Sequence, residues 1–136
     1  MAKVDMEKLK ILAPLMALEY NLNLLVIFGS QVSGHTHEKS DIDIGFLSDI
    51  NYGPIEIVKM QMDLEQRLAV GPVELVDLKT VPALLLKHVA LEGNLLYEKR
   101  PHLMARLQIY GVKRTMEAKK LLDLRHLSVI KFLQTH

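Results

Sequence analysis

Two aspartates follow a Gly-Ser pair at a spacing that suits nucleotide chemistry. Gly29 and Ser30 come directly after the apolar run 24–28, and Asp41 and Asp43 open a second apolar run. Alternate residues of a strand point to the same face, so the two carboxylates would stand roughly 6–7 Å apart. Such like charges repel unless a cation lies between them. Oxygen ligands of this kind suit Mg²⁺, and two such ions stabilise an in-line displacement, so the pattern predicts nucleotidyl transfer.

The Gly-Ser pair is predicted to hold the phosphates of the nucleotide. It lies where a strand ends and a short helix is expected to begin, and a helix N-terminus offers free N–H groups and a positive dipole end. Gly29 lets the backbone approach a phosphate closely, and Ser30 adds a hydroxyl donor or caps the helix. Ser40, next to Asp41, is the third predicted nucleotide-binding residue. No Gly-Lys-Ser/Thr ending exists, which excludes a P-loop.

Hydrophobic periodicity predicts an alternation of helices and strands before residue 100. Helices are expected over 6–20, 55–68 and 81–91, and strands over 24–28, 41–47, 73–78 and 94–97. Pro54 suits a first helical turn, Gly71-Pro72 ends the second helix, and the last strand is expected at a sheet edge. The expected fold is therefore α/β (α+β), a small mixed sheet flanked by helices.

Residues 101–136 differ from the rest, because they are rich in Lys and Arg and carry no strand signal. Their apolar spacing favours helix, with Gly111 as a weak point. We therefore predict a core over residues 1–98 and a C-terminal helical extension over 99–136, packed on the core or on a partner. Its apolar positions exceed what a solvated tail needs, so we hypothesise that part of it docks a partner. An intramolecular helical cap is the alternative.

Composition excludes several classes of protein. The chain has 136 residues, 49% of them apolar, which fits one domain with a real core. A net charge of +1 and few aromatic residues argue against direct nucleic-acid binding. No apolar stretch approaches the roughly 18 residues of a membrane span, and no signal-peptide core begins the chain. Absence of cysteine is compatible with a reducing cytoplasm, where we expect the protein to act.

These motifs resemble those of the minimal nucleotidyltransferases, within the DNA polymerase beta-like nucleotidyltransferase superfamily. The matching signature is Gly29-Ser30, ten further residues, and Asp41-x-Asp43. The run 73–78 is similar to the later strand that supplies the family's third carboxylate, and Glu74 occupies the usual Asp position. The similarity covers roughly residues 10 to 100. The chain departs from many relatives at Glu74, which is one methylene longer, and at Gln31, where they have arginine.

The resemblance implies a nucleotidyltransferase fold and a function. Proteins of this size in the family are antitoxins encoded beside a HEPN-domain ribonuclease toxin, and they transfer AMP from ATP to a tyrosine of that toxin. It implies that Asp41, Asp43 and Glu74 are the catalytic and metal-binding residues, and that two Mg²⁺ ions take part. It also implies a hetero-oligomer with the toxin in the cytoplasm.

Alternatives remain at the level of residues and of function. Asp77 is the other candidate for the third carboxylate, but it lies three residues from Glu74 and so faces the opposite side of a regular strand. Asp63 and Glu65 are interpreted as the solvated face of a helix. A non-catalytic antitoxin that only binds its toxin is one alternative function. A transferase acting on a small molecule is the other, and the basic tail counts against the acidic acceptor pocket it needs.

Overall fold

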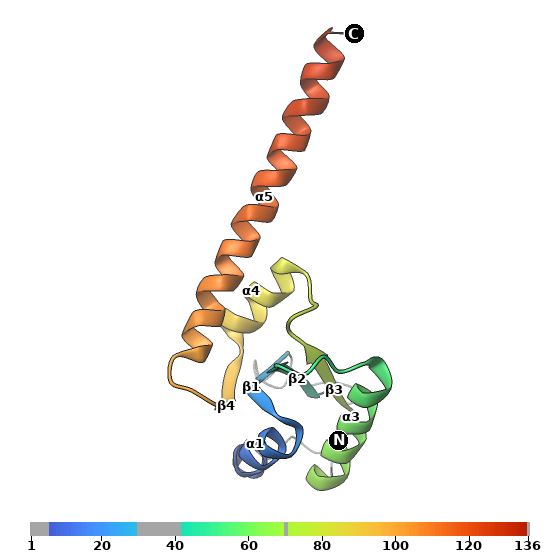
Figure 1. Ribbon diagram of the computed structural model, residues 1–136, viewed down its shortest axis with the longest axis vertical. Helices are drawn as coiled ribbons and strands as arrows, with labels where there is room; N and C mark the ends of the chain where they lie inside the picture. The colour runs from blue at the N-terminus through green and yellow to red at the C-terminus, as the bar shows by residue number, and fades with distance from the viewer. Residues whose placement is uncertain (1–5, 30–41, 70, 136) are drawn as a thin grey trace.

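The computed structural model describes residues 6–29, 42–69 and 71–135. Within these ranges the elements are, in order, α1 (Met6–Tyr20), β1 (Leu22–Phe28), β2 (Ile42–Ser48), α3 (Pro54–Leu68), β3 (Val73–Asp77), α4 (Ala83–Glu92), β4 (Asn94–Glu98) and α5 (Leu103–Thr135) (Figure 1). The predicted strands and longer helices are present, and Pro54 begins α3 as expected. The short helix expected after Gly29 falls outside the described residues.

The four strands form one mixed sheet in the order β3-β2-β1-β4. β1 runs antiparallel to both β2 and β4, whereas β2 runs parallel to β3. The last strand, β4, lies at an edge as predicted. The prediction of a small mixed sheet flanked by helices is therefore confirmed.

Helices cover both faces of this sheet. α1 and α3 lie against one face, and α4 lies against the other together with the beginning of α5 (Figure 1). Along β1, Leu25 and Ile27 enter the core beneath α1 and α3, while Leu24 and Val26 enter the core beneath α4. Burial on both sides explains why β1 is a continuous apolar run. It also determines register, because a slip by one residue would exchange the two faces.

The C-terminal segment is one continuous helix, so the interpretation of Gly111 as a weak point was wrong. α5 runs without a break from Leu103 to Thr135 and passes through Gly111, which is buried. A Cβ atom at this position would lie 3.1 Å from Cα of Lys87. Glycine therefore permits α5 to pack directly on the backbone of α4.

No helix in the described part of the chain has the length and apolarity needed to cross a membrane.

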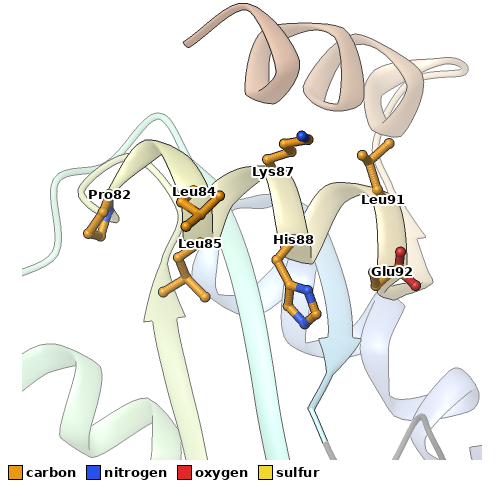
Figure 2. Close-up of a pocket in the computed structure, with 7 residues that line it drawn as sticks. All are labelled: Pro82, Leu84, Leu85, Lys87, His88, Leu91 and Glu92. Carbon is orange, nitrogen blue, oxygen red and sulfur yellow. The ribbon is translucent and has the colours of Figure 1, made fainter. Parts of the chain in front are cut away.

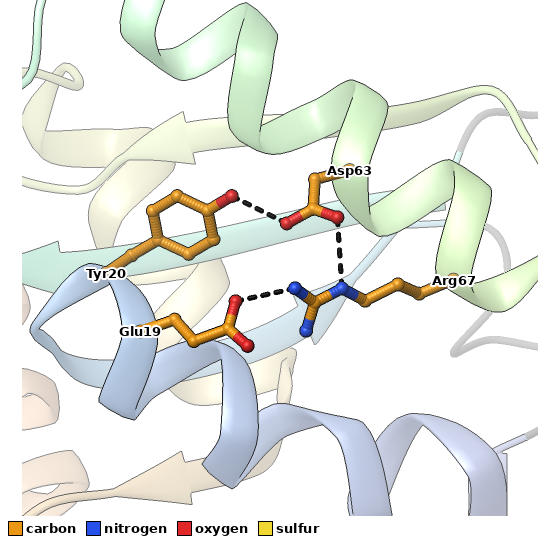
Figure 3. Close-up of polar contacts among 4 residues, drawn as sticks. All are labelled: Glu19, Tyr20, Asp63 and Arg67. Carbon is orange, nitrogen blue, oxygen red and sulfur yellow. Dashed lines mark hydrogen bonds and ion pairs between the residues drawn. The ribbon is translucent and has the colours of Figure 1, made fainter.

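A polar network joins α1 to α3 (Figure 3). The Tyr20 hydroxyl donates to Asp63 over 2.6 Å, and Nε of Arg67 donates to the same carboxylate over 3.0 Å. Arg67 also pairs with Glu19 over 2.6 Å. The interpretation of Asp63 as part of a solvated helix face was therefore wrong, because α1 lies against that side of α3.

The network changes the acidity of Tyr20. Its hydrogen bond to Asp63, assisted by burial and by the charge of that carboxylate, raises the pKa of the Tyr20 hydroxyl from 10.0 to about 12. The folded protein thus favours the neutral phenol, which is the form that donates the bond. A raised pKa of this kind stabilises the fold fully below pH 10, and the contribution is lost as the pH rises through the folded value near 12.

We predict that Tyr20→Phe lowers the free energy of unfolding by about 1 kcal/mol at neutral pH, the usual net value of such a bond after allowance for partial exposure. The difference between wild type and variant should shrink between pH 10 and about 12, because ionised Tyr20 cannot donate. Urea unfolding across this range measures both effects. Tyr97→Phe is the control, since the Tyr97 hydroxyl makes no hydrogen bond among the described residues. A difference that grew with pH would contradict the assignment.

Candidate active site

Asp43 lies near the beginning of β2 and faces the α4 side of the sheet. Its neighbours Ile42 and Ile44 are buried beneath α1 and α3, at 3% and 1% exposure. Because side chains alternate along a strand, Asp43 must point to the opposite face. It is half-buried there. The two isoleucines therefore fix the direction in which the carboxylate points.

Glu74 stands directly beside Asp43 on the neighbouring strand. The parallel pairing of β2 with β3 places the two Cα atoms in register. Paired residues of adjacent strands point to the same face, about 4.8 Å apart across the sheet. Glu74 is exposed, while Val73 and Leu75 on either side of it are buried on the opposite face. The sheet thus presents two adjacent carboxylates on one face, a hard oxygen donor set of the kind that binds divalent cations.

Gly29 completes this arrangement at the end of β1. It follows Phe28, whose Cα pairs with that of Asp43 across the antiparallel ladder. Gly29 has φ +88°, a left-handed conformation, and a Cβ atom here would overlap Oδ2 of Asp43. A residue with a side chain would be strained and would displace the carboxylate. Glycine therefore allows the backbone after β1 to lie against Asp43.

The described residues include three of the six predicted site residues. Gly29, Asp43 and Glu74 are brought together as described above. Asp41, Ser30 and Ser40 lie outside the described residues, as does Gln31. No set of three or more His, Asp or Glu side chains with the arrangement of a metal site occurs within residues 6–29, 42–69 and 71–135. The described part of the chain thus supplies two of the three predicted metal ligands.

Asp77, the other candidate for the third carboxylate, lies at the opposite end of β3. Its Oδ1 accepts a hydrogen bond from the backbone N–H of Lys79 over 3.0 Å. Its partner on β2 is Phe46, three positions beyond Asp43. Asp77 therefore stabilises the turn that follows the strand and stands away from the pair formed by Asp43 and Glu74.

Gln61, which the sequence analysis did not single out, supports the strand that carries Glu74. Its side-chain Oε1 accepts a hydrogen bond from the backbone N–H of Leu75 over 2.9 Å. β3 is an edge strand, so this N–H has no neighbouring strand to bond. Gln61 directly follows Met60, which is buried on the inner face of α3. The position of Gln61 beside the apolar stripe of α3 was the one signal in the sequence that could have indicated this role.

A separate groove of about 640 Å³ lies along the outer side of α4 (Figure 2). Figure 2 shows His88 and Leu85 pointing away from α5, whereas Lys87 points toward it. The lining consists of Pro82, Leu84, Leu85, Lys87, His88, Leu91 and Glu92. None of these residues belongs to the predicted site, so the groove and the carboxylate pair are different surfaces.

The family model described as polymerase beta, nucleotidyltransferase matches residues 10–102. A search of curated protein sequences finds no match to this chain.

Solved structures share the fold. A chain of the crystal structure of a toxin–antitoxin with AMP-PNP superposes with a TM-score of 0.69 at 22% identity, covering 93% of this chain and 98% of that one. A chain of the tri-AMPylated Shewanella oneidensis HEPN toxin in complex with its MNT antitoxin gives 0.65 at 20% identity, covering 95% and 99%. The MntA–HepT toxin–antitoxin gives 0.64 at 20%, covering 93% and 98%. The expected nucleotidyltransferase fold is thus confirmed.

We predict that Gly29→Ala disables the site, because the new methyl group forces the Asp43 carboxylate out of place. Binding of Mg²⁺-ATP, measured by calorimetry, should weaken at least about tenfold, while the unfolding free energy falls by about 1–2 kcal/mol. Gly53→Ala is the matched control. Gly53 has φ −81°, and an added Cβ meets its nearest atom, Oε1 of Glu56, at an ordinary 3.4 Å. Unchanged nucleotide binding by Gly29→Ala would show that this glycine does not shape the site.

Proposed function

This chain belongs to the polymerase beta nucleotidyltransferase family, and from that premise we propose that it is an antitoxin that transfers AMP from ATP to a tyrosine of a HEPN ribonuclease toxin. The modification disables the toxin, and the two proteins form a hetero-oligomer. The observation that carries the proposal is the position of Asp43, whose carboxylate lies against Gly29 and whose Cα pairs with that of Glu74 on the neighbouring strand.

The choice of substrate and partner is supported by the structural neighbours. They include a toxin–antitoxin with AMP-PNP, an analogue of ATP, and an MNT antitoxin in complex with a tri-AMPylated HEPN toxin. The likeness extends over at least 93% of this chain in both cases. Family, fold and site thus favour the same reaction class.

The donor set suits magnesium. Asp43 and Glu74 offer carboxylate oxygens on one face of the sheet. Asp41 precedes Asp43 by two residues in the sequence. We assign all three as the residues that would hold Mg²⁺. When bound, Mg²⁺ neutralises the charge on the transferring phosphate and activates the attacking oxygen.

The chain's own residues would position the reactants and move one proton. Gly29, Ser30 and Ser40 would hold the phosphates through backbone N–H and hydroxyl donors. The tyrosine oxygen attacks the α-phosphorus of ATP, a new P–O bond forms, and the bond to pyrophosphate breaks. Glu74, exposed beside Asp43, would accept the proton of the tyrosine hydroxyl, whose free pKa is about 10. Most of the remaining catalysis is positioning and charge neutralisation.

We predict that Asp43→Asn abolishes AMP transfer, because it removes a charge that would bind the metal while keeping the size of the side chain. Glu74→Gln should slow transfer at least about a hundredfold by removing the proton acceptor. Mass spectrometry of the proposed HEPN toxin, coexpressed with each variant, counts the added AMP units.

Asp77→Asn is the matched control for Glu74→Gln, because it removes a carboxylate from the same strand at its other end. It should leave transfer near the wild-type rate. Normal AMP transfer by Glu74→Gln combined with loss of transfer by Asp77→Asn would assign the role of the third carboxylate to Asp77. A toxin that is inhibited by wild-type protein but carries no added AMP would establish the binding-only antitoxin instead.

A further inference from the structure

α1 is apolar on both of its faces. The inner face packs on the sheet and buries five side chains, those of Leu9, Leu12, Ala13, Met16 and Ala17. The opposite face carries Ile11, Leu15 and Leu18, which are here named the outer stripe and are 71%, 53% and 81% exposed. These three residues are spaced four and three apart, so they lie within about 60° of one another around the helix axis.

The outer stripe has no cover within the described part of the chain. Leu18 is the most exposed large apolar side chain among the described residues. Pro14, which is also exposed, lies beside the outer stripe and extends its apolar surface. α4 and the beginning of α5 lie on the other face of the sheet (Figure 1). A helix that is apolar all round is normally covered on both sides, and exposed apolar surface of this kind marks an interaction site.

The charges beside the outer stripe favour a second copy of this chain as its occupant. Lys8 lies near one end of the stripe and Glu19 near the other. Both are on the flank that faces α3, because Lys8 donates to the Leu68 carbonyl over 3.5 Å. Glu19 in turn pairs with Arg67 of α3 over 2.6 Å. One flank of the stripe therefore carries a positive charge at its beginning and a negative charge at its end.

An antiparallel pair of α1 helices matches these charges. When two copies pack about a two-fold axis in this orientation, the same flanks meet with their ends reversed. Lys8 of each copy then lies beside Glu19 of the other, so the interface contains two ion pairs of opposite charge. A parallel pair would place the two flanks on opposite sides of the interface and would lose both contacts.

We propose that the outer stripe binds the outer stripe of a second copy of this chain, in an antiparallel helix pair with an ion pair between Lys8 and Glu19 at each end. With Lys8 level with Glu19, Ile11 lies between Leu15 and Leu18 of the other copy. A contact between two single helices buries less than about 1,200 Å² in total, so the dimer is weak and depends on concentration. Both candidate sites stay outside the interface, because α1 and the carboxylates are on opposite faces of the sheet.

Sedimentation equilibrium of the full-length chain, over micromolar to millimolar concentrations, should show a reversible equilibrium between monomer and dimer. Leu15→Glu places two charges in the middle of the helix pair, and the dissociation constant should rise at least about thirtyfold. Leu124→Glu is the matched control, because Leu124 lies on α5 with the same 53% exposure as Leu15. It has the same change in helix propensity and should dimerise within about threefold of wild type. Circular dichroism checks that both variants keep their helices.

Charge reversal tests the antiparallel orientation. In Lys8→Glu each new carboxylate faces Glu19 of the other copy, and the dissociation constant should rise at least about fivefold. An equimolar mixture of Lys8→Glu and Glu19→Lys restores opposite charges at both ends of the pair. This mixture should form a heterodimer more tightly than either variant forms a homodimer.

Four results would overturn the proposal. The first is a wild-type chain that stays monomeric at millimolar concentration. The second is a dimer that dissociates in Leu124→Glu and persists in Leu15→Glu, since it would place the interface on α5. Equal dimerisation by Lys8→Glu and wild type would overturn the antiparallel ion pairs. A monomeric wild-type chain that binds the proposed toxin, with binding lost in Leu15→Glu, would identify the toxin as the occupant instead of a second copy.

Discussion

The parallel pairing of β2 with β3 is the constraint on which the site depends. It sets Glu74 beside Asp43, and the burial of Ile42, Ile44 and Leu75 on the opposite face holds both strands in that register. A slip by one residue would turn the carboxylates into an apolar core. Burying such charges without partners costs far more than marginal protein stability allows. The core beneath α1 and α3 therefore stabilises the fold and excludes the registers in which the site would not exist.

The face that carries the carboxylates changes character along the strands. At the beginning of β2 it holds Asp43 and, across the ladder, Glu74. Two residues further, Gly45 leaves room for Leu78, which is buried, and a Cβ at Gly45 would lie 2.8 Å from the Leu78 side chain. At the polar end Glu74 is exposed among the described residues, while the apolar end is closed by α4 and the segment before it. One sheet face thus carries the candidate site and part of the core.

Local patterns predicted the elements, because period-two burial and helical spacing are written in adjacent residues. The same alternation predicts that Glu74 and Asp77 face opposite sides of the sheet. In the structure Glu74 pairs with Asp43, whereas Asp77 pairs with Phe46. What could not be predicted are contacts between segments far apart in the chain. Gly111 looks like a weak helix position from propensity, yet it touches Lys87 of α4. Asp63 looks solvated on α3 alone, yet Tyr20 of α1 donates to it.

The site could be predicted to a similar extent. Asp43 and Glu74 follow from motif and alternation, but their adjacency depends on which strands pair and in what direction, and single sequences do not encode that locally. Gln61 was missed for the same reason, since its role appears once Leu75 is known to belong to an edge strand. The close contact between Gly29 and Asp43 likewise depends on the pairing of β1 with β2.

α5 is connected to the side of the sheet that carries Asp43 and Glu74 through its packing on α4. Gly111 lets α5 contact α4 at Lys87, and the neighbouring Leu86 and Val89 are buried with Phe28, the residue before Gly29. The packing of α5 on α4 is thereby continuous with the core behind Gly29 and Asp43.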